Sequence, residues 1–172
     1  MKRGYIQVYT GNGKGKTTAA LGLALRAAGA GLRVFIMQFI KESRCSEHKA
    51  LERFTDLITI RQSGKGFILK SKPTDSDIAA AGKGLDEVKT IMRSGECDLL
   101  ILDEVNVAVN RGLISAAALL EVMDMKPENM ELVITGRYAC EEVVAKADLV
   151  TEMKEIRHYA KKDVKARVGI EK

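Results

Sequence analysis

The stretch from Tyr9 to Thr18 reads Tyr-Thr-Gly-Asn-Gly-Lys-Gly-Lys-Thr-Thr and contains the residue types that bind phosphate. It follows an apolar alternation typical of a strand and opens an alanine- and leucine-rich run typical of a helix. In a loop between a strand and a helix, glycines let backbone N–H groups converge on phosphate oxygens, a lysine reaches the phosphates and a hydroxyl binds Mg²⁺. We therefore expect Lys16 to bind phosphate and Thr17 to bind Mg²⁺.

This stretch departs from the general P-loop pattern at one position. The pattern begins with a glycine five positions before Gly15, and this chain has Thr10 there, with Gly11 and Gly13 supplying the flexible backbone instead. The alternative is a surface turn rich in glycine and lysine. The strand before the loop and the helix after it favour the phosphate loop.

Two further segments carry charged side chains directly after apolar runs. Asp98 to Glu104 reads Asp-Leu-Leu-Ile-Leu-Asp-Glu, and a carboxylate at such a strand end holds Mg²⁺ or a water bound to it. Asp103 could instead accept hydrogen bonds from loop amides, and Glu104 could be a solvated acid. Arg137 follows the run 131–135 and is placed either to contact phosphate or to lie on the surface.

The elements that must position these residues alternate between strand and helix, which predicts an α/β fold with a mainly parallel sheet flanked by helices. The expected strands are 4–10, 33–40, 57–61, 98–104, 131–135 and 149–153. The expected helices are 16–30, 50–54, 76–94, 115–123 and 141–147. We expect loops at 41–48 and 62–75, a cap at Asp75 or Ser76 for the helix 76–94, and its end at Gly95.

The length of 172 residues suits one domain spanning 1–172. The net charge is +5, and the segment 154–172 holds seven Lys or Arg residues against three Asp or Glu. This basic C-terminal tail could close over a polyanionic ligand as part of a lid, contact a partner subunit or meet nucleic acid. Few aromatic residues accompany it, so we expect no nucleic-acid partner.

Three cysteines at positions 45, 97 and 140 form no CxxC pair, so we expect them to be reduced and at least two of them to be buried. No apolar run approaches the length needed to cross a membrane, and no apolar stretch follows the basic N-terminal residues. The sequence therefore predicts a cytoplasmic protein without a membrane partner.

Six segments of the chain together carry a family resemblance. They are Thr10 to Ala20, Gln38-Phe39-Ile40-Lys41, Leu102-Asp103-Glu104, Ile134-Thr135-Gly136-Arg137, Ala147 to Met153 and Gly169-Ile170-Glu171. In this order and at this spacing they resemble the P-loop ATP:corrinoid adenosyltransferases, and the resemblance runs from about Gly4 to the C-terminus.

This resemblance implies a RecA-like P-loop domain, usually a homodimer, that binds MgATP and a reduced corrinoid. It implies that Co(I) attacks the 5′ carbon of ATP and releases triphosphate, with a low-potential flavoprotein as the reductant. Carried over by position, the catalytic residues are Lys16, Thr17 and Glu104, and the Mg²⁺ ligands are Thr17 and Glu104. The implied ATP-binding residues are Gly11, Asn12, Gly13, Lys14, Gly15, Lys16, Thr17, Thr18, Arg26 and Arg137.

The corrinoid side departs from the family pattern. A family loop bearing Gly-Phe-x-Trp helps to displace the lower axial ligand of cobalt, and here the loop reads Gly66-Phe67-Ile68-Leu69 in a chain without tryptophan. The resemblance still implies that Phe67 and Leu69 contact the corrinoid. Because the first expected strand begins at residue 4, we expect the basic tail, rather than an N-terminal extension, to close the site.

Two other classes of function remain open. The first is an ATPase or small-molecule kinase, in which attack falls on the γ-phosphate. The second is a module that binds nucleotide or corrinoid without turnover. The sequence shows no obvious catalytic histidine, since we expect His48 to lie in a loop and His158 to have a structural or lid role.

Overall fold

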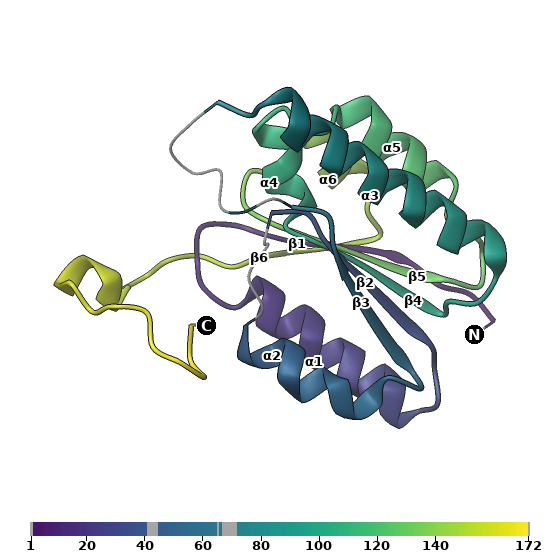
Figure 1. Cartoon of the computed structure of the whole chain (residues 1–172). Helices are drawn as coiled ribbons and strands as arrows, with labels where there is room; N and C mark the ends of the chain where they lie inside the picture. The colour runs from purple at the N-terminus through teal and green to yellow at the C-terminus, as the bar shows by residue number, and fades with distance from the viewer. Residues whose placement is uncertain (1, 41–44, 65, 67–71, 172) are drawn as a thin grey trace.

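The computed structural model describes residues 2–40, 45–64, 66 and 72–171. Six strands form one sheet in the order β3-β2-β4-β5-β1-β6, and every neighbouring pair is parallel (Figure 1). The α/β fold with a parallel sheet is therefore confirmed. The strands are β1 (Ile6–Thr10), β2 (Val34–Gln38), β3 (Ile58–Gln62), β4 (Leu99–Asp103), β5 (Glu131–Thr135) and β6 (Leu149–Glu152).

Helices cover both faces of the sheet (Figure 1). One face carries α1 (Lys16–Gly29), α2 (Ser46–Leu51) and the 3-10 turn η1 (Glu52–Phe54). The other carries α3 (Asp75–Ser94), α4 (Val105–Asn110), α5 (Ala116–Asp124) and α6 (Glu141–Lys146). Because both faces are covered, all five residues of β2 and of β4 are buried, as expected for central strands of a parallel sheet.

The register of the strands brings polar residues together at the carboxyl edge of the sheet. Gln38 of β2 pairs with Asp103 of β4, and Tyr9 of β1 pairs with Thr135 of β5. The loop after β1 leads to α1 at this same edge. The strand ends therefore line up beneath the phosphate-binding loop predicted from the sequence.

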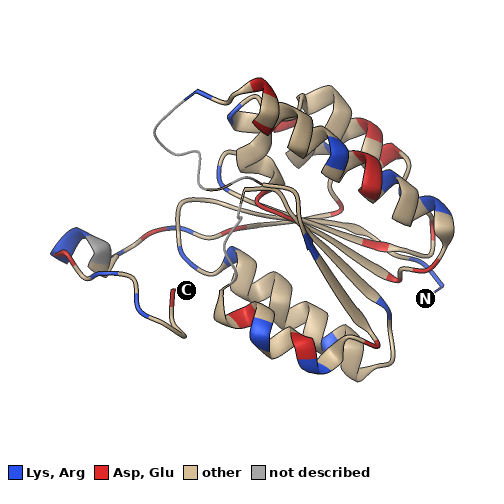
Figure 2. Cartoon of the chain, viewed as in Figure 1, with Lys and Arg blue, Asp and Glu red and all other residues tan. Residues whose placement is uncertain are grey.

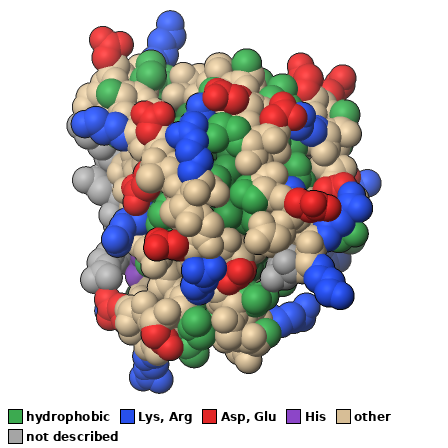
Figure 3. Space-filling model, turned by 90° about the vertical axis from the view of Figure 1, so that its right-hand side faces the viewer, with side chains coloured by type: hydrophobic (Ala, Val, Ile, Leu, Met, Phe, Trp, Pro, Cys, Tyr) green, Lys and Arg blue, Asp and Glu red, His purple; other side chains and the backbone are tan. Residues whose placement is uncertain are grey.

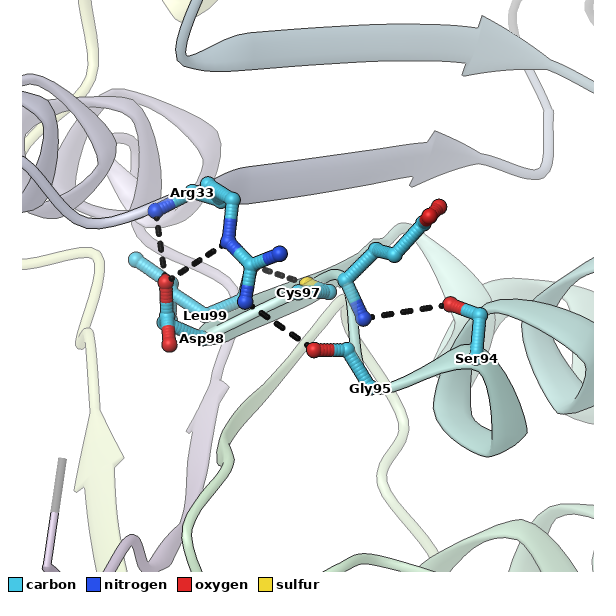
Figure 4. A network of polar contacts seen from close by, with 7 residues as sticks. Arg33, Ser94, Gly95, Cys97, Asp98 and Leu99 are labelled. Atoms are coloured by element: carbon cyan, nitrogen blue, oxygen red, sulfur yellow. Dashed lines mark hydrogen bonds and ion pairs between the residues drawn. The ribbon is translucent and has the colours of Figure 1, made fainter.

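At the opposite, amino edge, a polar network joins β2, β4 and α3. The backbone N–H of Arg33 donates to Asp98 Oδ2 at 2.8 Å, and its guanidinium donates to Asp98 Oδ2 at 3.3 Å and to Gly95 O at 3.0 Å (Figure 4). These bonds join the start of β2 to the start of β4 and to the end of α3. The surface at this edge shows charged side chains of both signs around a central apolar area (Figure 3).

Several predicted boundaries need correction. Residues 46–48 belong to α2, so the predicted loop 41–48 is wrong for this part; residues 41–44 lie outside the described chain. The helix α4 was not predicted. The cap of α3 is Thr74, which exchanges hydrogen bonds with Asp77, and the predicted caps Asp75 and Ser76 are wrong; the end at Gly95, with φ of 68°, is confirmed.

The cysteines also differ from expectation. Only Cys97 is buried, whereas Cys45 and Cys140 are half-buried, because the latter two precede short helices near the surface. None of the three, all within the described chain, forms a disulfide. Among the described residues, no helix is both long and apolar enough to cross a membrane.

The basic tail leaves the sheet after β6 and contains one 3-10 turn, η2 (Tyr159–Lys162). Lys and Arg residues are spread along it (Figure 2). Its last described residues turn back toward α1 (Figure 1). Lys14 Nζ donates to Ile170 O at 3.0 Å, which joins the end of the tail to the loop after β1.

Candidate functional site

A pocket of about 760 Å³ lies at the carboxyl edge of the sheet. One wall is the loop after β1 together with the first turns of α1, and another is the outward side of α2. Glu104 and Arg137 line it from the ends of β4 and β5, and the tail contributes His158 and residues 169–171. The pocket therefore collects residues from five separate segments of the chain.

The loop after β1 has the backbone shape of a P-loop. Gly11 and Gly15 have φ angles of 91° and 119°, which residues with side chains rarely adopt. Gly13 packs so closely on the chain after β6 that a Cβ there would lie 2.7 Å from Met153 O. The N–H of Gly13 donates to Met153 O at 2.6 Å, so this residue shapes the loop through a contact with the chain after β6.

Lys16 directs its ammonium group into the loop. Lys16 is only 6% exposed, and its Nζ donates to Gly11 O at 2.7 Å and to Gly13 O at 2.6 Å. Burial lowers the pKa of Lys16, and Arg137 lowers it further, whereas Glu104 raises it. Glu104 and Arg137 line the same pocket as Lys16 and act on its charge in opposite directions.

Asp103 is the centre of a buried hydrogen-bond cluster. Its Oδ1 accepts from the hydroxyls of Thr17 at 2.9 Å and Thr135 at 2.8 Å, and its Oδ2 accepts from Gln38 Nε2 at 3.0 Å. The carboxylate is 1% exposed and is satisfied by three donors, as a buried carboxylate must be. The donors are side chains rather than the loop amides considered from the sequence.

Glu104 has an unusual backbone conformation directly after β4. Its φ of 59° lies in the left-handed region, and its N–H donates to Thr135 Oγ1 at 2.9 Å. This turn lets the chain begin α4 at once while the half-buried Glu104 side chain lines the pocket. Thr17, Asp103 and Glu104 together offer hydroxyl and carboxylate oxygens, which are the donors that Mg²⁺ prefers, so the residues fit this ion.

Arg137 follows a glycine that the packing requires. Gly136 has a φ of 131°, and a Cβ there would lie 3.0 Å from the Asn106 side chain. The chain after β5 therefore passes close to α4 at Gly136. The exposed Arg137 side chain comes next and lines the pocket. A cation here can contact an anionic ligand held by the loop.

The other predicted residues fall into three groups. Lys14, Gly15 and Thr18 line the pocket with Lys16 and Thr17, whereas Gly11 and Asn12 lie beside it in the same loop without lining it. Arg26 is exposed in the last turn of α1, ten residues or about 15 Å from Lys16, and does not line the pocket. Phe67 and Leu69 lie outside the described residues.

No role in the site was predicted from the sequence for three polar residues of the cluster: Gln38, Thr135 and His48. Gln38 and Thr135 each end a strand directly after a buried apolar run, and a polar residue in that position is a usable sign of a side chain at the carboxyl edge. His48 is buried in α2 rather than placed in a loop. His158 lines the pocket from the tail.

Comparison with known proteins gives one consistent result. The family model described as ATP:corrinoid adenosyltransferase BtuR/CobO/CobP matches residues 2–171. A corrinoid adenosyltransferase of Pseudomonas aeruginosa is 33% identical over 171 residues, covering 99% of this chain and 84% of the relative. One of Escherichia coli is also 33% identical, covering 99% and 86%, and one of a Sinorhizobium species is 34% identical over 173 residues, covering 99% and 81%.

Proposed function

Because this chain belongs to the ATP:corrinoid adenosyltransferase family, we propose that it transfers the 5′-deoxyadenosyl group of MgATP to the Co(I) of a reduced corrinoid and releases triphosphate. The observation that carries the proposal is the meeting of Lys16, Thr17, Glu104 and Arg137 around one pocket at the carboxyl edge. An ammonium, a guanidinium and oxygen ligands for a metal ion are the groups that a triphosphate requires.

The transfer is a displacement at carbon. The electron pair of Co(I) forms the cobalt–carbon bond at C5′ while the C5′–O5′ bond breaks, and the electrons of that bond leave with the triphosphate. The step consumes no proton and needs no general base. Negative charge therefore grows on the departing phosphate oxygen, and the protein must stabilise it.

The residues of the site suit that task. The Lys16 ammonium lies within the loop, where low exposure strengthens its attraction for phosphate oxygens. Arg137 supplies a second cation, and the first turn of α1 lines the pocket, where a helix N-terminus favours a bound anion. Thr17 and Glu104 would hold Mg²⁺, with Asp103 orienting the Thr17 hydroxyl. Bound Mg²⁺ would neutralise charge on the triphosphate.

The remaining parts of the proposal come from the sequence and the family. Phe67 and Leu69 would contact the corrinoid, Asn12 and Arg26 would contact ATP, and a low-potential flavoprotein would reduce the corrinoid. We also propose a homodimer, which is supported by the exposed edge strand β6, where Leu149 and Val150 are 46% and 41% exposed. The cytoplasmic location and the lack of a nucleic-acid partner stay predictions from the sequence.

The test is an anaerobic reaction of the purified protein with ATP, Mg²⁺ and a chemically reduced corrinoid. Loss of the Co(I) absorbance, growth of a light-sensitive cobalt–carbon product and an equal amount of triphosphate would support the transfer. Persistence of Co(I) with ADP as the main product would favour the alternative, an ATPase or small-molecule kinase acting at the γ-phosphate. Binding of ATP without any product would favour a sensor or carrier.

A further inference from the structure

His48 is a buried histidine on the sheet-facing side of α2. Its residue is 2% exposed, although its neighbours Ser46, Glu47 and Ala50 line the pocket from the same short helix. Both of its ring nitrogens lie within hydrogen-bond distance of a partner. Nδ1 lies 2.9 Å from the backbone N of Cys45, and Nε2 lies 2.9 Å from Gln38 Oε1.

These two contacts determine which nitrogen carries the proton. The Cys45 N–H is a donor, so Nδ1 must accept and carries no proton. Gln38 Oε1 is an acceptor, so Nε2 must donate and carries the proton. His48 is therefore the neutral Nε2–H tautomer, and each nitrogen has a partner of the opposite kind.

The Nε2–H group in turn fixes the orientation of the Gln38 amide. Gln38 Oε1 accepts from His48 and also from Gln62 Nε2 at 3.3 Å, and Gln38 Nε2 donates to Asp103 Oδ2 at 3.0 Å. A flip of the amide would turn its oxygen toward a carboxylate and its NH₂ toward two donors. With His48 in place, only one orientation satisfies the cluster.

The chain of hydrogen bonds ends at the predicted metal site. Asp103 accepts from Gln38 on one oxygen and from Thr17 on the other, and Thr17 is a predicted Mg²⁺ ligand. The donor and the acceptor are defined in each hydrogen bond that leads from the Cys45 N–H through His48 and Gln38 to Asp103. The wall of the pocket formed by α2 is thereby linked to the phosphate loop through the buried ends of β2 and β4.

We propose that His48 is a positioning residue, which through Gln38 and Asp103 holds the Thr17 hydroxyl in place for MgATP. The inference rests on the proposed function of the pocket as an MgATP site. Residues that orient metal ligands through hydrogen bonds typically change metal affinity or activity about 10–100-fold when they are removed. The same size of effect is expected here, although His48 does not itself reach the pocket.

A direct metal site at His48 is the competing interpretation. Ligand atoms of Cys45, Glu47 and His48 lie within 4.8 Å of one another, a spacing compatible with a metal ion. Both nitrogens of His48 are already engaged, however, by the Cys45 N–H and the Gln38 amide. A metal ion could bind His48 only by breaking the hydrogen bonds that orient Gln38, so we assign the positioning role.

The first test compares ATP affinity with Mg²⁺ and with excess chelator by calorimetry. His48→Leu fills the site without the Nε2–H, and we expect a 10–100-fold loss of affinity with Mg²⁺ and little change in chelator. His48→Gln keeps an N–H donor for Gln38 and should stay within about threefold of wild type. Lys49→Ala, an exposed change on the same helix, is the control and should match wild type.

Equal losses in His48→Leu and His48→Gln, or a loss that is the same in Mg²⁺ and in chelator, would overturn the positioning role and leave His48 as a packing residue. Wild-type protein that binds ATP no more tightly with Mg²⁺ would instead overturn the metal assignment of the proposed function. The inference about His48 is then decided by a second measurement.

That measurement needs no variant. Nitrogen chemical shifts of the His48 ring, read from ¹⁵N-labelled protein at neutral pH, distinguish a protonated Nε2 from a protonated Nδ1. We expect protonation at Nε2 alone, with His48→Leu identifying the resonance. A proton on Nδ1, or a ring that averages between tautomers, would overturn the proposal.

Discussion

The Lys16 ammonium is buried among the carbonyl oxygens of its own loop. A neighbouring cation could therefore not replace its positive charge in the same position. We predict that Lys16→Met, which keeps the length of the side chain, lowers kcat for adenosyl transfer about 10²–10³-fold, the usual cost of removing a group that stabilises developing negative charge. The anaerobic assay measures it. Lys83→Met, an exposed change on α3, is the control, and a Lys16→Met variant with near-normal turnover would contradict the assignment.

Cys97 differs from the other two cysteines in the expected reactivity of its thiol. Burial raises its pKa to about 11, and its thiol donates to Leu99 O at 3.1 Å. Because the thiolate is the reactive form, Cys97 should not react with a thiol reagent at pH 8 in the folded protein. Cys45 and Cys140 should react first, and Cys97 only in denaturant. Peptide mapping after timed labelling identifies the order, and early labelling of Cys97 would contradict it.

The loop proposed to bind phosphate could be located from the sequence because its glycines, a lysine and a hydroxyl follow one another in the chain. The residues that support this loop could not be predicted in the same way. Gln38 and Thr135 contact Asp103 from two neighbouring strands, and His48 contacts Gln38 from α2, so only the folded sheet and the helix packed on it bring these residues together. Long-range contacts of this kind leave no local periodicity to read.

Helix α3 contains two glycines in contrasting surroundings. A Cβ at Gly84 would lie 2.4 Å from the Ser63 Cβ, whereas a Cβ at Gly82 would meet nothing within 4 Å. We predict that Gly84→Ala destabilises the protein by about 1–3 kcal/mol through overpacking. Gly82→Ala should stabilise it by up to about 1 kcal/mol, since alanine favours a helix interior.

Urea unfolding of both variants measures the difference. Gly82→Ala is the control for Gly84→Ala, because both variants carry the same substitution in the same helix. Similar free energies of unfolding for the two variants would show that α3 does not pack against the end of β3 as described.

The amino edge of the sheet should respond to acid through Asp98. The backbone N–H of Arg33, and then its guanidinium, lower the pKa of Asp98 below its usual value near 4. A carboxyl group whose pKa is lower in the folded than in the unfolded protein stabilises the fold at pH values above its unfolded-state pKa. This stability is lost as the pH falls through the folded-state pKa. We predict that Asp98→Asn costs about 1 kcal/mol at pH 7, because the Arg33 side chain is half-exposed and partly screened.

The cost of Asp98→Asn should shrink progressively as the pH falls below about 4, where the wild-type carboxylate also becomes protonated. Urea unfolding at several pH values gives the comparison. A cost that stays constant into acid would mean that Asp98 acts through its shape rather than its charge.

All six strands and most helices could be predicted because each long element has a clear apolar period. The exceptions are short. The helix α2 spans six residues, begins in a polar stretch and packs against the sheet through the buried residues His48 and Leu51. The helix α4 begins at once after β4 because Glu104 adopts a left-handed conformation. Helices this short derive their stability from tertiary packing, which a local pattern does not record.

The tail is joined to the body of the molecule at its far end. Lys14 Nζ donates to Ile170 O, and Glu171 accepts from the Arg167 guanidinium and the Tyr159 hydroxyl. The donors, Arg167 first and then Tyr159, lower the pKa of Glu171 to about 2. This cluster keeps residues 169–171 against the pocket, as a lid would require.

We predict that deletion of residues 164–172 raises KM for ATP roughly fivefold, which corresponds to about 1 kcal/mol of binding. The melting temperature should stay nearly unchanged, since none of the described residues from 164 to 171 belongs to the buried core. Steady-state kinetics and thermal unfolding measure both. An unchanged KM would show that the tail does not cover bound nucleotide.

The left-handed backbone of Glu104 has a further consequence, for protein engineering. A residue with a side chain held at positive φ costs on the order of 1–3 kcal/mol, which glycine would largely avoid. A screen for thermal resistance alone would therefore favour Glu104→Gly, a substitution that removes the carboxylate expected to bind the metal ion. Heat tolerance and turnover are opposed at this single position, so a stabilised form of this enzyme should be sought with Glu104 held constant.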